Sequence, residues 1–315
     1  MTRQTKALLI AATGEDPEPY RALMTARFPE LVIQAEGVDD YDPATIAYAL
    51  CWFPAEGLLA SLPNLEVIFS MGAGIDHILR DPALPADLPI VRLMHDKTRE
   101  QMRDYALHAV LHYYRQMDLA ARRQRDKTWK FIQIRPKDQF RIGLMGVGEM
   151  GRAVAQGLND LGFSVMGWSR SPKEISGVET YSGADGLLAM AAQSAVLISI
   201  LPATGETVGL LNADVFAAMP KGGVVVNLGR GNHLVTDDLL AALDNGHLGG
   251  ATLDVFAPEP MPQDSPFWDH PLVRVTPHIG SDGNAEIIAD SVIDNIRRVE
   301  SGLPPAPLGD RARGY

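Results

Sequence analysis

The stretch FRIGLMGVGEMG, from Phe140 to Gly151, decides the fold, because a short apolar run leads in it to three glycines, Gly146, Gly148 and Gly151. The apolar run predicts a β-strand that delivers the backbone to a helix beginning near Glu149. Glycines at this spacing allow a tight turn, the close approach of a pyrophosphate to the backbone, and close packing of the helix on the strand. The stretch therefore predicts a dinucleotide site.

The residues after the glycines fit the same unit. AVAQGLNDLGF has the spacing of a helix that ends at Gly162, and SVMGWSR supplies the next strand. Together they complete a βαβ unit of about thirty residues, the length that this motif requires. A glycine triplet alone also occurs in plain strand-to-helix turns, but the surrounding pattern favours the nucleotide site.

Length and composition indicate an ordinary globular protein. A chain of 315 residues exceeds the usual size of a single core, so two domains are expected. The net charge of −11 argues against a nucleic-acid partner, and no apolar run is long enough for a membrane span. The single cysteine, Cys51, permits no internal disulfide; its apolar surroundings predict a buried core residue, and a cytoplasmic protein is the simplest setting.

The segment before the fingerprint predicts a separate parallel α/β layer. Because the glycines arrive only at Gly146, this earlier unit cannot be the nucleotide half, and two domains imply a cleft between them. A long helix from Thr98 to about Gln124 should connect them, with a hinge near its start. The predicted pieces are the strands KALLIAA, LVIQAEG, ALCWF, LEVIFSM and PIVRL and the helices YRALMTARF and DPATIAYA.

Strand and helix patterns continue to alternate after the fingerprint and give six strands in all. A last amphipathic helix from Asn284 to Ser301 should return the chain to the first domain. The fold class is therefore α/β with two doubly wound parallel-sheet domains: a discontinuous, flavodoxin-like substrate-binding domain of residues 1–101 and 284–315, and an NAD(P)-binding Rossmann domain of residues 102–283.

Three polar residues follow successive strands of the second domain. Arg230 follows GVVVNLG, Glu259 follows ATLDVF and His278 follows LVRVTP. Ligands of such sheets bind beyond the carboxyl ends of the strands, so a cation, an acid and a base-like group there suggest a catalytic site. Taken singly, each has a plain alternative: a surface cation, a turn residue, or a histidine bonded to a loop carbonyl.

The blocks NLGRG, DVFAPEP and TPHIG resemble the signature blocks of the D-2-hydroxyacid dehydrogenase family, which also follow a glycine fingerprint. Within that family, ALCWFP, VIFSMGAGID, GWSRSPK, LPATGETVGLLN and the terminal DRARGY are similar to the glyoxylate/hydroxypyruvate reductase A subgroup. The resemblance covers nearly the whole chain. It implies reduction of glyoxylate to glycolate and of hydroxypyruvate to D-glycerate, and a homodimer formed through the coenzyme domain.

Reduction of a 2-keto acid needs a proton donor at the carbonyl oxygen and a cation for the substrate's charge, besides a hydride. His278 suits the first role, with Glu259 orienting its ring and favouring the imidazolium. Arg230 suits the second. The resemblance adds a carboxylate-binding loop and an aromatic wall, although the residue after the wall is Phe53 where the subgroup has histidine. The predicted substrate-binding residues are Trp52, Gly72, Ala73, Gly74, Arg230 and His278.

The second strand of the Rossmann domain ends without the acidic residue that binds the ribose 2′-hydroxyl of NADH. The guanidinium of Arg170 and the hydroxyls beside it suit a 2′-phosphate, so NADPH is the predicted cofactor, with NADH use left open. The predicted cofactor-binding residues are Gly146, Val147, Gly148, Glu149, Met150, Gly151, Trp168, Ser169, Arg170, Ser171, Lys173, Leu201, Pro202, Thr207, Leu228, Gly229, Asp254 and Gly280.

Two other functions stay open. One is a D-2-hydroxyacid dehydrogenase with a different substrate range; the other is a nucleotide-sensing regulatory protein of the same fold that turns over little substrate. No metal site is expected, since His108 and His112 share a helix face without a third ligand. Trp129 and Phe131, in a polar stretch, are candidates to cover a subunit partner.

Overall fold

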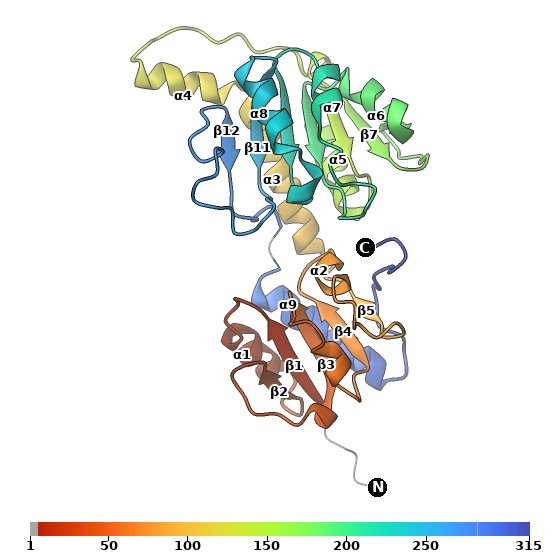
Figure 1. Ribbon diagram of the computed structural model, residues 1–315. Coiled ribbons are helices and arrows are strands. Elements are labelled where there is room, and N and C mark those ends of the chain that lie inside the picture. Colours follow the sequence, from red (N-terminus) through yellow and green to blue (C-terminus); the bar gives the residue numbers. More distant parts are fainter. Residues whose placement is uncertain (1–5, 282) are drawn as a thin grey trace. The chain divides into compact units, whose positions relative to one another are not determined.

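The computed structural model describes residues 6–281 and 283–315, and the chain divides into two compact units (Figure 1). The first unit comprises Met1–Thr98 and Asp282–Tyr315, and the second comprises Arg99–Ser281. Residues 1–5 of the predicted first domain and residue 282 of the predicted second domain lie outside the described residues. Each unit is built on one parallel sheet.

The first unit has a five-stranded sheet in the order β2-β1-β3-β4-β5, with every pair parallel. This is the flavodoxin-like order that the sequence predicts. Strands β1 and β3 are buried on both faces, which explains their unbroken apolar runs. The strands are β1 (Ala7–Ala12), β2 (Val32–Ala35), β3 (Ile46–Trp52), β4 (Val67–Ser70) and β5 (Ile90–Val91).

Helices cover both faces of this sheet. Helices α1 (Glu18–Arg27) and α9 (Ala285–Glu300) pack on one face, and the short α2 (Asp76–Leu79) and the 3-10 turn Leu59–Ser61 pack on the other. The predicted last helix is confirmed: Asn284 caps it, because its side-chain oxygen accepts a hydrogen bond from Ile287 N. Seven residues of α9 are buried, so the C-terminal segment belongs to the core of the first unit.

The prediction of a helix over DPATIAYA is wrong. Only a single 3-10 turn forms, over Pro43–Thr45, because the carboxylate of Asp42 accepts a hydrogen bond from Ala44 N at 2.9 Å and caps one turn. Strand β3 begins directly afterwards at Ile46, and every residue from there to Cys51 is buried. Burial of both faces of a central strand outweighs the helical spacing of the short segment.

The second unit has a seven-stranded parallel sheet in the order β12-β11-β10-β9-β6-β7-β8. The order reverses between the neighbours β6 and β9, which is the switch point where such sheets bind ligands. The sequence predicts six strands; it misses the edge strand β8, whose residues ETYS are not buried and show no apolar run. The strands are β6 (Ile142–Met145), β7 (Val165–Ser169), β8 (Glu179–Ser182), β9 (Val196–Ser199), β10 (Gly223–Asn227), β11 (Leu248–Leu253) and β12 (Val273–Val275).

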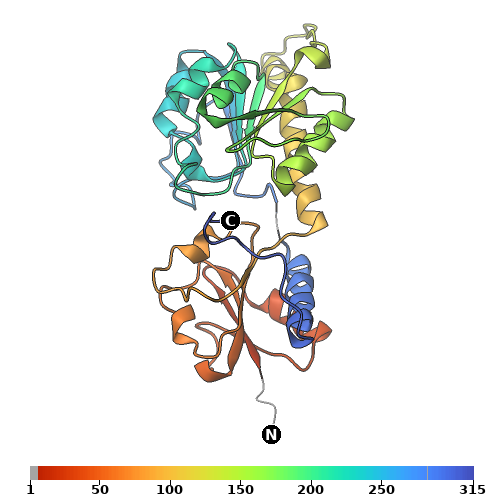
Figure 2. The ribbon, with the colours of Figure 1, turned by 90° about the vertical axis from the view of Figure 1, so that its right-hand side faces the viewer.

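Two sets of helices sandwich this sheet (Figure 2). Helices α3 (Asp96–Tyr114) and α5 (Glu149–Asp160) share one apolar cluster with it, and α6 (Gly183–Ala191), α7 (Ala213–Ala218) and α8 (Thr236–Asp244) share the other. The predicted helix after the fingerprint is thus confirmed, and Gly162 follows its end with a φ of +82°.

The prediction of one continuous helix from Thr98 to about Gln124 is wrong. Helix α3 ends at Tyr114, and a second helix, α4 (Met117–Arg125), begins after Gln116, whose φ of +53° is left-handed. The side chain of Gln116 donates to Gln133 O at 2.9 Å, which ties the break to the segment that follows α4. That segment ends in a 3-10 turn over Lys137–Gln139.

Cys51 is fully buried in β3, and burial raises the pKa of its thiol. Its predicted role as a core residue is therefore confirmed. Across the described part of the chain, no helix is both long and apolar enough to cross a bilayer.

The cap of α9 gives a stability prediction. Replacing Asn284 by Ala leaves the Ile287 amide without its acceptor, so we expect the free energy of unfolding of the first unit to fall by about 1 kcal/mol. Asn284→Asp keeps an acceptor and serves as the matched control. Urea unfolding followed by circular dichroism compares the two variants, and equal midpoints would contradict the cap.

Candidate active site

The three glycines of the fingerprint occupy three different environments. Gly146 has a φ of +99°, and a Cβ atom there would lie 2.7 Å from Ile200 O. A Cβ atom at Gly151 would lie 1.9 Å from Gly146 O, so α5 packs directly on the turn. At Gly148, just before α5, a Cβ atom would meet no described atom within 4 Å. A pyrophosphate site needs these three features: a tight turn, open backbone at a helix N-terminus, and close packing of the helix on the turn.

The predicted cofactor-binding residues lie at or after the carboxyl ends of strands in the second unit's sheet. Because parallel strands end at one edge, these loops lie along the same edge, with the loops after β6 and β9 meeting at the switch point. The groups are residues 146–151 after β6, 168–173 at the end of β7, 201–207 after β9, 228–229 after β10, Asp254 after β11 and Gly280 after β12.

The loop after β9 is held by the hydroxyl of Thr207, which lies 2.8 Å from Pro202 O. His233, fully buried, links this loop to the one after β10: its Nδ1 accepts from Arg230 N at 3.2 Å and its Nε2 lies 3.2 Å from Pro202 O. Since Nδ1 accepts, the hydrogen-bond network assigns the proton to Nε2. The sequence does not indicate His233, because nothing in its spacing separates it from a surface histidine.

The end of β7 presents one charged group to solvent. Trp168 is buried and donates from Nε1 to Gly183 O at 2.8 Å, and Ser169 donates to Ser171 O at 2.7 Å. The exposed guanidinium of Arg170 forms an ion pair of 2.6 Å with Glu206, from the loop after β9. The sequence does not indicate Glu206 either, because the pair joins two loops that are far apart in the chain.

The structure brings Glu259 and His278 together. Nδ1 of His278 lies 2.8 Å from one carboxylate oxygen of Glu259, and Phe256 N donates to the other at 2.8 Å. Burial alone would raise the pKa of Glu259, but these hydrogen bonds and the nearby charges of His278 and Arg230 lower it overall. Glu259 is therefore ionised at neutral pH.

Two glycines let the loop after β10 pack closely on its neighbours. A Cβ atom at Gly231 would lie 1.9 Å from the carbonyl carbon of Phe256, and one at Gly229 would lie 2.7 Å from Leu201 O. Asn227 at the end of β10 donates to Arg230 O at 2.9 Å. These contacts place the Arg230 guanidinium where its charge acts on Glu259.

Asp254 holds the loop that carries His278. Its carboxylate is 1% exposed; Oδ1 accepts from the Thr276 hydroxyl at 2.6 Å and from Ile279 N at 2.9 Å, and Oδ2 accepts from Gly280 N at 2.7 Å. Within this loop His278 has a φ of +54°, in the left-handed region that non-glycine residues rarely adopt. Asp254 and Gly280 thus support the His278 loop, and their contact with a cofactor stays a prediction.

In the first unit, the residues predicted to bind the substrate carboxylate lie in the loop after β4. Gly72 O accepts from Leu93 N at 3.0 Å and Ala73 O accepts from Arg92 Nε at 2.7 Å, so these carbonyls are engaged. Within the described residues, the amides of Ala73 and Gly74 have no recorded acceptor. Gly72 is not left-handed, and its amide donates to Ser70 Oγ at 3.1 Å, so this predicted donor is engaged within the loop. A Cβ atom at Gly72 would lie 3.2 Å from the Trp52 ring, which borders the loop.

Phe53, which replaces the subgroup's histidine, has a φ of +47°. Its ring packs edge-on against Trp52, with centroids 5.1 Å apart, and the Arg80 guanidinium lies 4.8 Å from its centroid. The buried ring of His77 packs against both aromatic rings. The predicted wall at Trp52 is thus one side of an aromatic cluster that includes a residue with left-handed backbone.

Other polar clusters of the second unit have structural partners. His112 pairs with Asp118 at 2.7 Å, and no group of three or more His, Cys, Asp or Glu in the described residues is arranged to hold a metal ion.

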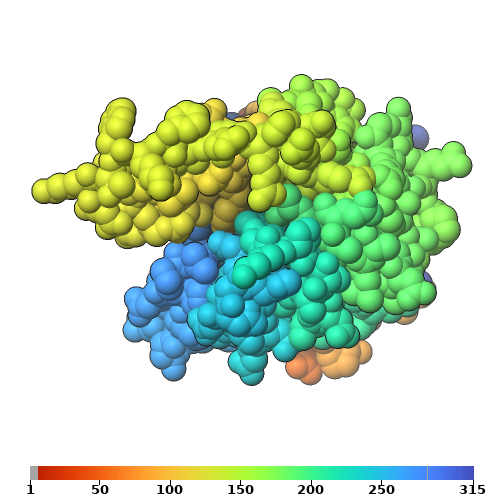
Figure 3. Space-filling view, turned by 90° about the horizontal axis from the view of Figure 1, so that it is seen from above, coloured from red at the N-terminus to blue at the C-terminus, as the bar shows by residue number. Residues whose placement is uncertain are grey.

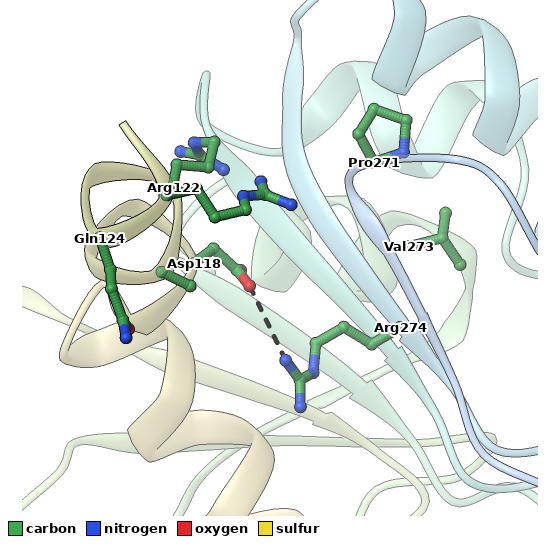
Figure 4. A pocket seen from close by; sticks show the side chains of 8 residues that line it. Asp118, Arg122, Gln124, Pro271, Val273 and Arg274 are labelled. Atoms are coloured by element: carbon green, nitrogen blue, oxygen red, sulfur yellow. Dashed lines mark ion pairs between the residues drawn. The ribbon is translucent and has the colours of Figure 1, made fainter. Parts of the chain in front are cut away.

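A cavity of about 620 Å³ between α4 and β12 contains none of the predicted site residues (Figure 4). Its lining residues are Asp118, Ala121, Arg122, Gln124, Arg125, Pro271, Val273 and Arg274.

Known proteins resemble this chain in both sequence and fold. The family profile described as D-isomer specific 2-hydroxyacid dehydrogenase, NAD binding domain, matches residues 107–280. The glyoxylate/hydroxypyruvate reductase A of Serratia proteamaculans is 41% identical over 303 residues, which cover 95% of this chain and 96% of the relative.

Two solved structures each have a TM-score of 0.92 and 36% identity. One is a D-isomer specific 2-hydroxyacid dehydrogenase from Xanthobacter autotrophicus in complex with NADPH and MES, with 99% of this chain and 100% of that chain covered. The other is an NADPH-dependent glyoxylate/hydroxypyruvate reductase from Sinorhizobium meliloti in complex with NADP and sulfate, with 98% and 100% covered. The chain therefore belongs to the D-isomer specific 2-hydroxyacid dehydrogenase family and is an NAD(P)-dependent oxidoreductase.

Proposed function

We propose that this protein reduces small 2-keto acids, glyoxylate and hydroxypyruvate among them, with NADPH as the reductant. The observation that carries the proposal is the convergence of Arg230, Glu259 and His278 after three neighbouring parallel strands, at the sheet edge that also holds the glycine turn. The relatives named as glyoxylate/hydroxypyruvate reductases support the choice of substrate. The cytoplasmic setting stays a prediction.

The residues at this edge fit a nicotinamide dinucleotide, which supplies the hydride when bound. His278 donates the proton that the carbonyl oxygen needs, from Nε2, because Nδ1 is engaged by Glu259. The ionised Glu259 fixes the orientation of the ring, because its carboxylate engages Nδ1. Phe256 N holds the Glu259 carboxylate in turn, so the histidine is oriented by a group that is itself oriented.

Arg230 supplies the cation. Its planar guanidinium suits the substrate carboxylate and carbonyl oxygen, and its charge stabilises the negative charge that develops on that oxygen. In the first unit we assign the substrate carboxylate to the amides of Ala73 and Gly74. Trp52, packed beside Gly72, limits the size of the acid that this loop accepts.

The preference for NADPH rests on Arg170, with a lesser contribution from Lys173. No acidic residue follows β7 directly, so the strand end itself presents no carboxylate that would repel a 2′-phosphate. Glu206 pairs with Arg170, but both side chains are mostly exposed, and such pairs are weak. A dianionic phosphate can therefore displace Glu206 from the guanidinium.

We also propose that two copies of the chain associate through the second unit. Helix α4 has no buried residue, and beyond it the rings of Trp129 and Phe131 are almost fully exposed. A hollow separates α4 from the residues around β12 (Figure 3). Exposed aromatic rings next to a helix without buried residues are typical of an interface surface.

The catalytic assignment predicts the behaviour of two variants. His278→Ala and Arg230→Ala should each lower kcat for glyoxylate by about 100-fold or more, because each removes a group that acts in the transition state. The dissociation constant of NADPH, measured by fluorescence, should change by less than about threefold. His270→Ala, which alters a largely buried histidine that pairs with Asp244 and belongs to no predicted site, is the matched control.

Loss of NADPH absorbance measures turnover with a panel of 2-keto acids. Near-normal turnover in either variant would contradict the assigned role. A wild-type protein inactive on the whole panel, with NADPH and with NADH, would contradict the proposed function itself.

The cofactor assignment predicts a change in selectivity. Arg170→Ala should raise the KM for NADPH about tenfold and leave the KM for NADH within about twofold, because only NADPH carries the 2′-phosphate. Lys173→Ala should show a smaller effect in the same direction. Equal effects of Arg170→Ala on the two cofactors would refute the phosphate contact.

The assembly proposal predicts a dimer in solution. Light scattering after size exclusion should give twice the chain mass of 34.2 kDa, and replacing Trp129 and Phe131 together by Ala should shift the protein toward the monomer. Trp268→Ala, at a tryptophan that is 51% exposed in the same unit, is the control and should leave the mass unchanged. A monomeric wild-type protein at micromolar concentration would sink the proposal.

A further inference from the structure

A chain of short hydrogen bonds joins helix α3 to the loop that carries His278. The hydroxyl of Tyr105, from α3, lies 2.5 Å from Thr276 Oγ1, which lies 2.6 Å from Asp254 Oδ1. The same carboxylate accepts from Ile279 N and Gly280 N, on the far side of His278. His278 is thus bracketed by Thr276 and Ile279, both fixed to one buried carboxylate.

The direction of this chain follows from its donors. The Asp254 carboxylate receives three hydrogen bonds, so it acts only as an acceptor, and the single proton of Thr276 is used on it. Thr276 Oγ1 must then accept, and Tyr105 must donate. Burial raises the pKa of Tyr105, which keeps its hydroxyl proton in place at neutral pH.

Helix α3, which carries Tyr105, is anchored in the core of the second unit. Ala106, Ala109 and Val110 are buried in the cluster that α3 shares with α5 and the sheet. Met102, one turn before Ala106, reaches within 3.8 Å of the point where a Cβ atom of Gly280 would lie. The helix therefore contacts the His278 loop at both of its ends, through Met102 at Gly280 and through Tyr105 at Thr276.

We propose that Tyr105 is a positioning residue for His278: acting through Thr276 and Asp254, it holds the left-handed backbone that aims the imidazole. The inference rests on the proposed function, since it concerns the residue proposed there as the proton donor. It extends the active site to helix α3, which no residue of the catalytic set reaches.

The chain contains a matched control. Tyr113, two turns further along α3, also bonds to a threonine hydroxyl, but within the sheet: its hydroxyl lies 2.8 Å from Thr252 Oγ1 on β11. In the described residues, Thr252 has no recorded hydrogen bond to Asp254 or to the loop of residues 276–280 through its side chain. Tyr105→Phe and Tyr113→Phe therefore remove equivalent hydroxyls, of which only one is tied to His278.

The kinetic test compares these variants with glyoxylate and NADPH. We expect Tyr105→Phe to lower kcat about tenfold, the factor that corresponds to one buried hydrogen bond, while KM for glyoxylate and the dissociation constant of NADPH stay within about twofold. Tyr113→Phe should leave kcat within about twofold. Equal losses of kcat in the two variants would overturn the proposal.

Variants of Thr276 test the relay. Thr276→Ser keeps the hydroxyl and should retain kcat, whereas Thr276→Val should lower it as Tyr105→Phe does. Because both changes break one chain, the double variant Tyr105→Phe with Thr276→Val should be no slower than Thr276→Val alone. Additive losses would show that Tyr105 acts by another route and would overturn the relay.

Hydrogen exchange separates failure of this inference from failure of the proposed function. In the full chain, the amides of Ile279 and Gly280 donate to Asp254, so Tyr105→Phe should speed their exchange at least about threefold relative to wild type and to Tyr113→Phe. This readout needs no substrate. Unchanged exchange at both amides would overturn the positioning role even in an active enzyme, and faster exchange in an enzyme inactive on 2-keto acids would leave only the proposed function refuted.

Discussion

Because all seven strands of the second unit run in one direction, their carboxyl ends meet at a single edge of the sheet, and every proposed chemical group of that unit depends on this alignment. The glycine turn follows β6, Arg230 follows β10, Glu259 follows β11 and His278 follows β12. The reversal of strand order between β6 and β9 leaves the loops after those two strands open to a ligand. An antiparallel sheet of the same sequence would place alternate groups at opposite edges.

A buried carboxylate then fixes the finer geometry at that edge. An ionised group inside a protein costs several kcal/mol unless donors surround it, and Asp254 is almost fully buried. Its three donors are Thr276, Ile279 and Gly280, so the backbone between them must curl around the carboxylate. The left-handed conformation of His278 follows from that curl. A structural carboxylate thus determines where the imidazole of the neighbouring residue lies.

Much of this architecture could be predicted from the sequence, because its signals are local. The fingerprint gave β6 and α5, and apolar runs gave the other buried strands. Predictions failed where a tertiary contact decides the local structure. Strand β3 forms where a helix was predicted, because both its faces are covered, and edge strand β8 pairs without an apolar run. Helix α3 ends just before the left-handed Gln116, although the helical pattern continues. At the site, the strand ends indicated Arg230, Glu259 and His278, but His233, Glu206 and Tyr105 act through partners distant in sequence.

The geometry at His278 also bears on the choice between an enzyme and a nucleotide-sensing protein of the same fold. Left-handed backbone at a non-glycine residue costs about 1 kcal/mol or more and persists only where its surroundings enforce it. The backbone of His278 is surrounded by a buried carboxylate, two backbone donors and a hydroxyl relay from α3. Glu259 bonds to one ring nitrogen, and the His278 side chain is about one-third exposed. A sensor needs only to close on its nucleotide, and a histidine anywhere on the loop would serve it. Proton transfer, the role proposed for His278, needs one imidazole nitrogen aimed at a reacting atom, and the constraint of this single residue by several groups fits that role.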